Sequence, residues 1–177
     1  MQYAIDYASP LGGVLLACDD TGLTGLWFAG SKYFARGVQP DHERREHPVF
    51  TETKKWLDVY FSGRNPDFWP PLHLQGSPFQ REVWALLCSI PYGEITTYGA
   101  LAQRVAALRG QERMSAQAVG GAVGHNPVSL IVPCHRVVGT GGSLTGYAGG
   151  VEKKRRLLML EGVDMSGLSV PTRGTAL

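Results

Sequence analysis

The chain has 177 residues, of which 44% are hydrophobic and 18% charged, with a formal net charge of +2, so we expect one or two compact, folded domains. Three cysteines without paired spacing argue against a disulfide framework or a zinc ribbon and favour a reducing compartment, the cytoplasm. The N-terminus lacks a signal-peptide pattern, and no stretch approaches the roughly 20 apolar residues of a membrane helix, so nothing predicts membrane association.

The first segments of the chain have the pattern of a small β-sheet. Three short strand-like stretches, residues 2–9, 12–20 and 23–30, are separated by the turn signals SPLGG and DDTG, which favours antiparallel hairpins. Residues 30–47 are polar, contain Gly and Pro, and show no apolar period. They predict a long surface loop.

A helix is expected next, because Phe50, Trp56, Leu57 and Tyr60 lie near helical spacing and Gly63 ends the pattern. We expect this helix to pack on the small sheet. The following stretch, NPDFWPPLHLQG, is typical of a linker. Up to this point the chain holds 7 basic and 9 acidic residues, against 10 and 6 afterwards, a mild asymmetry that fits an anion-binding second part or simply a solvated surface.

A second unit begins at Ser77, where SPFQ combines an N-cap serine, a proline at the first helical position and Gln80 at the capping-box position. The helix that follows should end before Pro91. Its apolar face is expected to consist of Phe79, Val83, Leu86, Leu87 and Ile90.

Two shorter helices are expected next, TYGALAQRVAAL and then AQAVGGAVGHN with Ser115 as its cap. Such a pair suggests a helix-turn-helix, although many helical domains contain one without touching DNA. Gly120 and Gly121 leave the second helix thin enough for another surface to approach closely. Asn126 and Pro127 end it and deliver the chain directly into the next segment.

The run VSLIVPCHRVV, residues 128–138, predicts a buried strand with a thiol inside it. Packing is the ordinary role of a buried cysteine. A strand through a core would not carry His135 and Arg136 in succession, however, so the chain must bend at Cys134, where Pro133 favours a bend. A base and a positive neighbour favour the thiolate, and His135 with Arg136 could supply both.

The glycine-rich stretch GTGGSLTGYAGG lacks the GK[ST] of a phosphate loop and the last glycine of the dinucleotide pattern, so no nucleotide cofactor is expected. It is either a mobile loop or a flexible wall against a flat ligand, with Tyr147 available to stack or hydrogen-bond. The last helix, VEKKRRLLMLEG, ends at Glu161, where a carboxylate opposes the helix dipole at a cost of about 0.3 to 1 kcal/mol. Glu161 should therefore have a partner, and His135 is a candidate in a base-and-orienter arrangement.

The ordered set SPFQREVW, IPYGEITTYGALA, AVGGAVGHNPVSLIVPCHRVVG and GSLTGYAGGVEKKRRLLMLEG resembles the O6-alkylguanine-DNA alkyltransferases, also called methylated-DNA protein-cysteine methyltransferases. The resemblance is close over residues 77–162 and looser, in layout only, over 1–76. It implies an α+β fold with a small N-terminal α/β domain, 1–76, containing a ribonuclease-H-like antiparallel sheet. Residues 77–162 would form a mainly helical DNA-binding and alkyl-transfer domain with a helix-turn-helix. The tail, residues 163–177, is expected to be partly disordered.

The resemblance implies a single-turnover repair reaction, in which Cys134 takes the alkyl group from O6 of a damaged guanine and keeps it as a thioether. A thioether carbon has no activated leaving group, so the protein would be consumed. In the family's scheme, His135 deprotonates Cys134 through a water and Glu161 orients that histidine. Asn126 would fix the turn between the recognition helix and the active-site segment, and Tyr98 would donate a hydrogen bond to the departing guanine.

The same resemblance assigns substrate contacts around the cysteine. The backbone carbonyls of Cys134 and Val137 would recognise the guanine edge, Tyr147 and the glycine-rich wall would hold the flipped base, and Lys154 would lie near the active site. The partner implied is double-stranded DNA containing O6-alkylguanine, bound by a monomer through the minor groove with the damaged base turned out of the stack. No metal and no other cofactor is expected.

The remaining DNA contacts are expected from the second helix of the helix-turn-helix and the turn before it, at Arg113, Ser115, Ala116, Gln117 and Gly120. The chain departs from the family at Gln117, where many members carry an intercalating arginine. Glutamine is shorter and uncharged, so the efficiency of base flipping and its salt dependence are in doubt at this position. Arg113 nearby could compensate.

Three other classes of function stay open on the sequence alone. A non-catalytic damage-binding module would lack the reactive cysteine, which this chain keeps at Cys134. A thiol hydrolase using Cys134 and His135 would need an oxyanion hole and would turn over. A helix-turn-helix regulator would bind a specific operator sequence.

Overall fold

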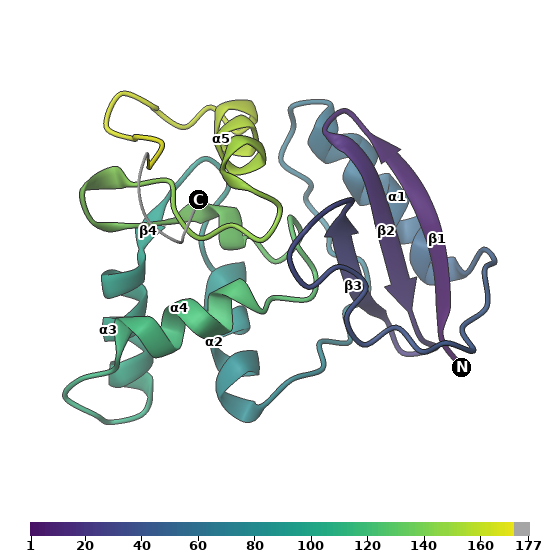
Figure 1. Cartoon of the computed structure of the whole chain (residues 1–177), viewed down its shortest axis with the longest axis horizontal. Coiled ribbons are helices and arrows are strands. Elements are labelled where there is room, and N and C mark those ends of the chain that lie inside the picture. Colours follow the sequence, from purple (N-terminus) through teal and green to yellow (C-terminus); the bar gives the residue numbers. More distant parts are fainter. Residues whose placement is uncertain (172–177) are drawn as a thin grey trace. The chain divides into compact units, whose positions relative to one another are not determined.

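The computed structural model describes residues 1–171 and divides into two compact units (Figure 1). The first unit comprises Met1–Gln75 together with Pro127–Ser129, and the second comprises Gly76–Asn126 and the chain from Leu130 onward. Within the described part of the chain, no helix has the length and apolar character needed to cross a bilayer.

The first unit is built on an antiparallel sheet of three strands in the order β1-β2-β3 (Figure 1). These strands are β1 (Tyr3–Ser9), β2 (Gly12–Cys18) and β3 (Leu23–Phe28), which confirms the three expected segments. The first hairpin pairs Ser9 with Gly12, whose φ of 106° lies in a region that glycine adopts without steric cost.

The helix α1 (Pro48–Phe61) packs on β2 and β3, as the sequence predicts. His47 is its N-cap, with Nδ1 accepting a hydrogen bond from the backbone N–H of Val49 at 3.1 Å. The helix buries one face, whose members are Val49, Phe50, Thr53, Trp56, Leu57 and Tyr60.

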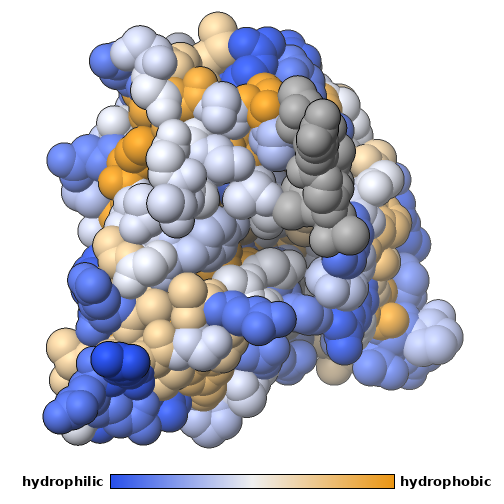
Figure 2. Space-filling view, turned by 60° about the vertical axis from the view of Figure 1, so that its left-hand side comes forward, coloured by the Kyte–Doolittle hydropathy of each residue, from blue (hydrophilic) through white to orange (hydrophobic). Residues whose placement is uncertain are grey.

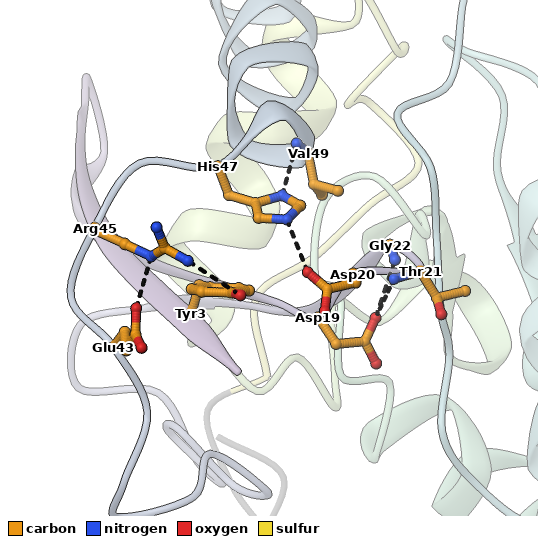
Figure 3. Close-up of polar contacts among 9 residues, drawn as sticks. All are labelled: Tyr3, Asp19, Asp20, Thr21, Gly22, Glu43, Arg45, His47 and Val49. Atoms are coloured by element: carbon orange, nitrogen blue, oxygen red, sulfur yellow. Dashed lines mark hydrogen bonds and ion pairs between the residues drawn. The ribbon is translucent and has the colours of Figure 1, made fainter. Parts of the chain in front are cut away.

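The polar loop over residues 30–47 lies at the surface, as the sequence predicts, and contacts the sheet through two partly buried residues. Ala35 and Val38 of the loop contact a buried cluster of Ala4, Leu15, Ala17 and Trp27. The end of the loop is pinned by polar contacts (Figure 3), because the Arg45 guanidinium lies 4.8 Å from the centre of the Tyr3 ring and also pairs with Glu43. His47 in turn bonds Asp20 at 3.3 Å, which ties the start of α1 to the turn after β2.

The second unit contains four α-helices among the described residues. They are α2 (Pro78–Cys88), α3 (Tyr98–Leu108), α4 (Ala116–Gly124) and α5 (Val151–Leu160). Two of them, α2 and α4, begin at the N-caps that the sequence predicts. The capping box before α2 is complete, with Ser77 and Gln80 each accepting from the other's backbone N–H at 3.1 and 3.0 Å. Ser115 accepts from the N–H of Ala118 and begins α4 as expected.

The core of this unit is centred on a tryptophan that the helical pattern did not single out. Trp84 of α2 is 1% exposed, and its indole N–H donates to the carbonyl of Ala122 in α4 at 2.8 Å. Phe79 and Leu86, which were expected on the buried face, are only partly buried. The contact fixes α4 against α2 while α3 packs on α4, which is the arrangement of a helix-turn-helix.

The expected strand over residues 128–138 is wrong for most of its length. Only Val137–Val138 forms a strand, β5, which pairs in parallel with β4 (Thr96–Thr97). Upstream, the backbone leaves extended geometry, with Leu130 at a φ of 74°. The apolar composition therefore reports burial of this segment and not its secondary structure, because a buried backbone can also be satisfied through turns.

Residues 127–129 find hydrogen-bond partners in the first unit. Leu26 of β3 donates to the carbonyl of Pro127 at 2.9 Å and accepts from the N–H of Ser129 at 3.1 Å, which places these residues in the first unit. The tail, residues 163–177, was expected to be partly disordered. Its first part, Val163–Ser169, packs within the second unit. Residues 172–177, which the expectation also covers, lie outside the described residues.

Candidate active site

The thiol of Cys134 sits on a sharp bend at the start of a 3₁₀ turn, Cys134–Arg136. Pro133, at φ −83° and ψ 63°, forms an inverse γ-turn, and the N–H of Cys134 donates to the carbonyl of Val132 at 2.8 Å. Asn126 donates to the same carbonyl at 2.8 Å from the end of the recognition helix. The bend expected at Pro133 is therefore present, and Asn126 braces it.

His135 and Glu161 form a fully buried pair beside this bend. The histidine Nε2 lies 2.5 Å from Oε2 of Glu161, and both side chains are 0% exposed. Because the carboxylate accepts the Nε2–H, the neutral ring keeps its basic lone pair on Nδ1. Glu161 at the end of α5 therefore has the partner that the sequence predicts for it, His135.

The other oxygen of Glu161 is also occupied. Oε1 accepts from the Arg136 guanidinium at 2.8 Å and from the backbone N–H of Gly93 at 3.0 Å. Arg136 further donates to the carbonyl of Ile90 at 2.7 Å, which ties α5 and the Cys134 turn to the segment after α2. A carboxylate with this many donors has one fixed orientation.

Burial sets the protonation of this pair. Complete burial lowers the pKa of His135 below 6.5, although the hydrogen bond and charge of Glu161 act in the opposite direction. Burial opposes ionisation of Glu161, but the hydrogen bonds and charges of His135 and Arg136 outweigh it and lower the pKa of that carboxyl to about 2. At neutral pH the site therefore holds a neutral imidazole oriented by an ionised carboxylate.

Burial likewise raises the pKa of the Cys134 thiol, since a thiolate loses its hydration there. Two groups act against that rise, a hydrogen bond from the Asn126 side chain and the positive charge of Lys154. Arg136, which the sequence offered as the positive neighbour, pairs with Glu161 instead. The local cation for the thiolate is Lys154.

Lys154 is buried at 0% exposure in α5 and donates to the backbone carbonyls of Val137 and of Thr145, the latter at 2.8 Å. Burial lowers its pKa from 10.5 to about 8, and the nearby Cys134 thiolate favours its charged form. The hydroxyl of Tyr98 donates to the same Thr145 carbonyl at 3.1 Å. The parallel pairing of β4 with β5 sets Thr97 opposite Val138, and Tyr98, the first residue of α3, follows directly.

The glycine-rich segment forms one wall of this cluster. The Tyr147 ring is 8% exposed and meets the His135 ring edge-on, with centroids 6.4 Å apart. Gly146 has a φ of 85°, and a Cβ at that position would lie 2.6 Å from the Tyr98 hydroxyl. Only glycine fits between the tyrosine and the wall, so the sequence pattern GY has a steric reason here.

The predicted DNA contacts lie together on the outer face of α4 and the turn before it, at positions that are all exposed: Arg113, Ser115, Ala116 and Gln117. Gly120 faces inward, where a Cβ would lie 3.7 Å from the Tyr98 ring. Figure 2 shows pale orange, moderately apolar residues bordered by blue hydrophilic ones low on this face, at the height of α3 and α4 in Figure 1. A helix face of small residues with one amide suits close approach to a groove.

Sequence reasoning missed two groups of the site, the Gly93 N–H and the structural pairing of Arg136 with Glu161. Neither has a local signal, because each bond joins residues at least 25 positions apart. In the described part of the chain, no group of three or more His, Cys, Asp or Glu side chains is placed to bind a metal ion.

Two domain models of one protein family match this chain. Residues 3–74 match the ribonuclease-like domain of 6-O-methylguanine DNA methyltransferase, and residues 78–163 match the DNA binding domain of the same family. A methylated-DNA protein-cysteine methyltransferase of Methanosarcina acetivorans is 43% identical over 162 residues, which are 92% of this chain and 99% of that protein. The protein of the same name from Haemophilus influenzae is 40% identical over 90% of this chain and 86% of its own length.

A solved structure agrees with the sequence matches. The crystal structure of Mycobacterium tuberculosis OGT in complex with DNA superposes with a TM-score of 0.77 at 39% identity, covering 90% of this chain and 92% of that one. A crystal structure of the O6-methylguanine methyltransferase of the same organism superposes with a TM-score of 0.74, covering 91% and 93%.

Proposed function

This chain belongs to the 6-O-methylguanine DNA methyltransferase family, and from that premise we propose that it repairs alkylated DNA by moving an alkyl group from O6 of guanine onto Cys134. The observation that carries the assignment of residues is the buried Cys134 turn beside the His135–Glu161 pair. The reaction is a single turnover, because the thioether product has no route back to a thiol.

The reaction balances with groups of this site. His135 takes the thiol proton through a water, and the Cys134 sulfur attacks the alkyl carbon. The C–S bond forms while the C–O6 bond breaks, and the electron pair passes to the guanine. In this scheme the Tyr98 hydroxyl, which donates to the Thr145 carbonyl in this structure, turns to donate toward the departing base and limits the charge that accumulates there. Burial raises the pKa of Tyr98, so its hydroxyl remains a donor at neutral pH.

Three further residues support this chemistry. Lys154 supplies a positive charge to the developing thiolate, and Asn126 supplies a hydrogen bond. Lys154 also holds the carbonyl of Val137, which we assign with the Cys134 carbonyl to recognition of the guanine edge. Tyr147 forms the wall against the flipped base.

We further propose that a monomer binds double-stranded DNA through the minor groove with the exposed face of α4. The DNA complex of the Mycobacterium tuberculosis relative supports binding of DNA by this fold. Small residues and Gln117 on that face fit a groove whose sequence pattern is degenerate, which suits a protein that scans for damage. The three free cysteines fit a reducing cytoplasm.

The proposal is tested by mass spectrometry of the intact chain after incubation with duplex DNA containing O6-methylguanine, followed by peptide mapping. We expect one methyl group per chain, located on the peptide that carries Cys134, and unmodified guanine in the DNA. Undamaged duplex is the control for nonspecific methylation.

Two matched variants sharpen this test. Cys134→Ala should gain no methyl group yet still bind the duplex, whereas Cys88→Ala should gain it at the normal rate, because Cys88 lies at the end of α2 and its pKa is raised to about 11 by burial. Binding without mass gain by the unmodified chain would favour a damage-binding module. Repeated turnover on esters or peptides would favour a thiol hydrolase.

A further inference from the structure

The C-terminal segment Val163–Ser169 folds back over the loop that leads into the substrate wall (Figure 1). Its apolar side chains pack on a buried cluster of the second unit. The segment contributes Val163, Met165 and Leu168, and the cluster consists of Val138, Leu144 and Leu158. Leu144 is 1% exposed, so the tail completes its burial.

Backbone pairing reinforces this packing. The N–H of Leu144 donates to the carbonyl of Ser169 at 2.8 Å, and the N–H of Ser169 donates to the carbonyl of Gly142 at 3.0 Å. At Gly142, a Cβ would lie 2.0 Å from the carbonyl oxygen of Gly167. The loop and the tail therefore meet backbone to backbone, at a spacing that no side chain could occupy.

The next residue of the loop is held from the opposite direction. Thr145 offers its carbonyl to Tyr98 and Lys154, two groups that the proposed reaction uses. Leu144 is thus fixed by the tail while Thr145 is fixed by the site. Gly146 and Tyr147, which face the proposed base pocket, follow directly in the chain. Their position is therefore set by how Leu144 and Thr145 are held.

We propose that Val163–Ser169 is a positioning segment that holds the substrate wall, and that it determines how tightly the alkyl group is aligned with Cys134 and which alkyl sizes are accepted. The inference rests on the proposed function. Nearly all of the segment lies beyond residue 163, where the match to the DNA binding domain of the family ends.

The test compares two truncations of the full chain in single-turnover transfer from duplex DNA containing O6-methylguanine or O6-benzylguanine. One ends after Gly162 and lacks the segment, and its matched control ends after Pro171 and keeps it. We expect the first to lose about tenfold in the maximal rate constant for methyl transfer, since a small misplacement of reacting groups has effects of this order or larger. We expect a smaller loss for benzyl transfer, because a looser wall tolerates a larger group.

Affinity for the damaged duplex separates positioning from loss of fold. It should stay within about twofold of the full chain in both truncations, since the α4 face is untouched, whereas general unfolding would weaken binding and transfer together. A point variant gives the same comparison without a truncation. Leu168→Ser should shift the ratio of benzyl to methyl rates toward benzyl, and Val170→Ser, which changes a residue 46% exposed, should not.

The inference would be overturned if the truncation after Gly162 transferred methyl and benzyl groups at the same rates as the truncation after Pro171. It would also be overturned if both rates fell by the same factor and DNA binding weakened as well. Failure of the proposed function looks different, because the full chain itself would then gain no alkyl group from either duplex.

Discussion

Lys154 carries a positive charge in a place where burial opposes it. Its pKa of about 8 leaves the ammonium mostly protonated at neutral pH, where it donates to two buried carbonyls and faces the Cys134 thiol. The cost of burying it is offset by those contacts. Such an arrangement is found where a charge serves the chemistry of a site and not only the stability of the fold.

Replacing Lys154 with methionine should therefore slow transfer and raise the pKa of the Cys134 thiol. We expect a loss of about 10- to 100-fold in the rate constant, because two carbonyls lose their donor and the thiolate loses its cation. Iodoacetamide labelling at Cys134 across a pH series, resolved by peptide mass spectrometry, reports the thiol pKa. Lys153→Met is the matched control, and an unchanged labelling profile in Lys154→Met would contradict the role.

Gln117 occupies the position at which the resemblance leads us to expect an intercalating arginine, and it is exposed on α4. Gln117→Arg should strengthen binding to duplex DNA at low salt and steepen the dependence of log affinity on log salt by about 0.9, the effect of one extra phosphate contact. Fluorescence anisotropy over a salt series measures both. If Arg113 compensates for Gln117, Arg113→Ala should make the dependence of log affinity on log salt shallower. An unaltered dependence would mean that Arg113 does not contact DNA.

In the proposed reaction, Glu161 orients His135, the base, through their hydrogen bond. Glu161→Gln keeps the shape but removes the charge that supports a developing imidazolium, so transfer should fall by about 100-fold or more, the range of general base catalysis. The measurement is the single-turnover rate against pH. In the unmodified chain, the midpoint of the decline of the rate in acid should lie below pH 6.5, since burial lowers the pKa of His135. A midpoint above pH 6.5 would argue against His135 as the base.

At the scale of secondary structure, the start of α3 decides where Tyr98 lies. Thr97 is the N-cap, with its hydroxyl accepting from the N–H of Ala100 at 3.0 Å. Thr97→Ala should cost about 1 kcal/mol in the free energy of unfolding and should also slow transfer. Thr97→Ser keeps the cap and should restore both. Denaturant unfolding and transfer rates of the three proteins test this. An unchanged transfer rate in Thr97→Ala would argue against a role for Tyr98 in the reaction.

Elements with local signals could be predicted from the sequence, and elements made by distant pairing could not. Ser77 and Ser115 gave the starts of α2 and α4, because an N-cap involves only the next three residues. The pairing of β4 with β5 joins segments of two residues each, too short for any alternation to show. The run through Cys134 was mistaken for a strand because apolar composition measures burial alone.

The site followed the same division. Cys134, His135 and Glu161 could be assembled from the family motifs and from the misplaced charge at a helix end. The pairing of Arg136 with Glu161 was not anticipated, since Arg136 lies two residues from Cys134 in the sequence while Lys154, the cation that acts on the thiol, lies far along the chain. The packing of Val163–Ser169 had no signal either, because its partners lie in a glycine-rich loop.

At the scale of the whole molecule, the buried pair couples stability to pH. His135 and Glu161 both have a lower pKa in the folded chain than their ordinary values of 6.5 and 4.5, so the unfolded chain binds more protons as the pH falls. Their contribution to stability is complete above pH 6.5 and declines between pH 6.5 and about 2. The thermal midpoint should fall through that range, and Glu161→Gln should flatten the lower part of the curve. A midpoint that stays constant in acid would mean that the pair is not buried as described.

Pro127–Ser129 belong to the first unit although the chain on either side of them belongs to the second. Between α4 and the Cys134 turn, these three residues hydrogen-bond to Leu26 of the first unit's sheet. A cut in the linker near residue 76 would separate the sheet from Pro127–Ser129, which the second fragment carries. We therefore expect each fragment alone to be less stable than the same unit in the whole chain. We expect the two fragments to reassociate when they are expressed together, which makes the linker a suitable cut site for a split reporter of alkyl transfer.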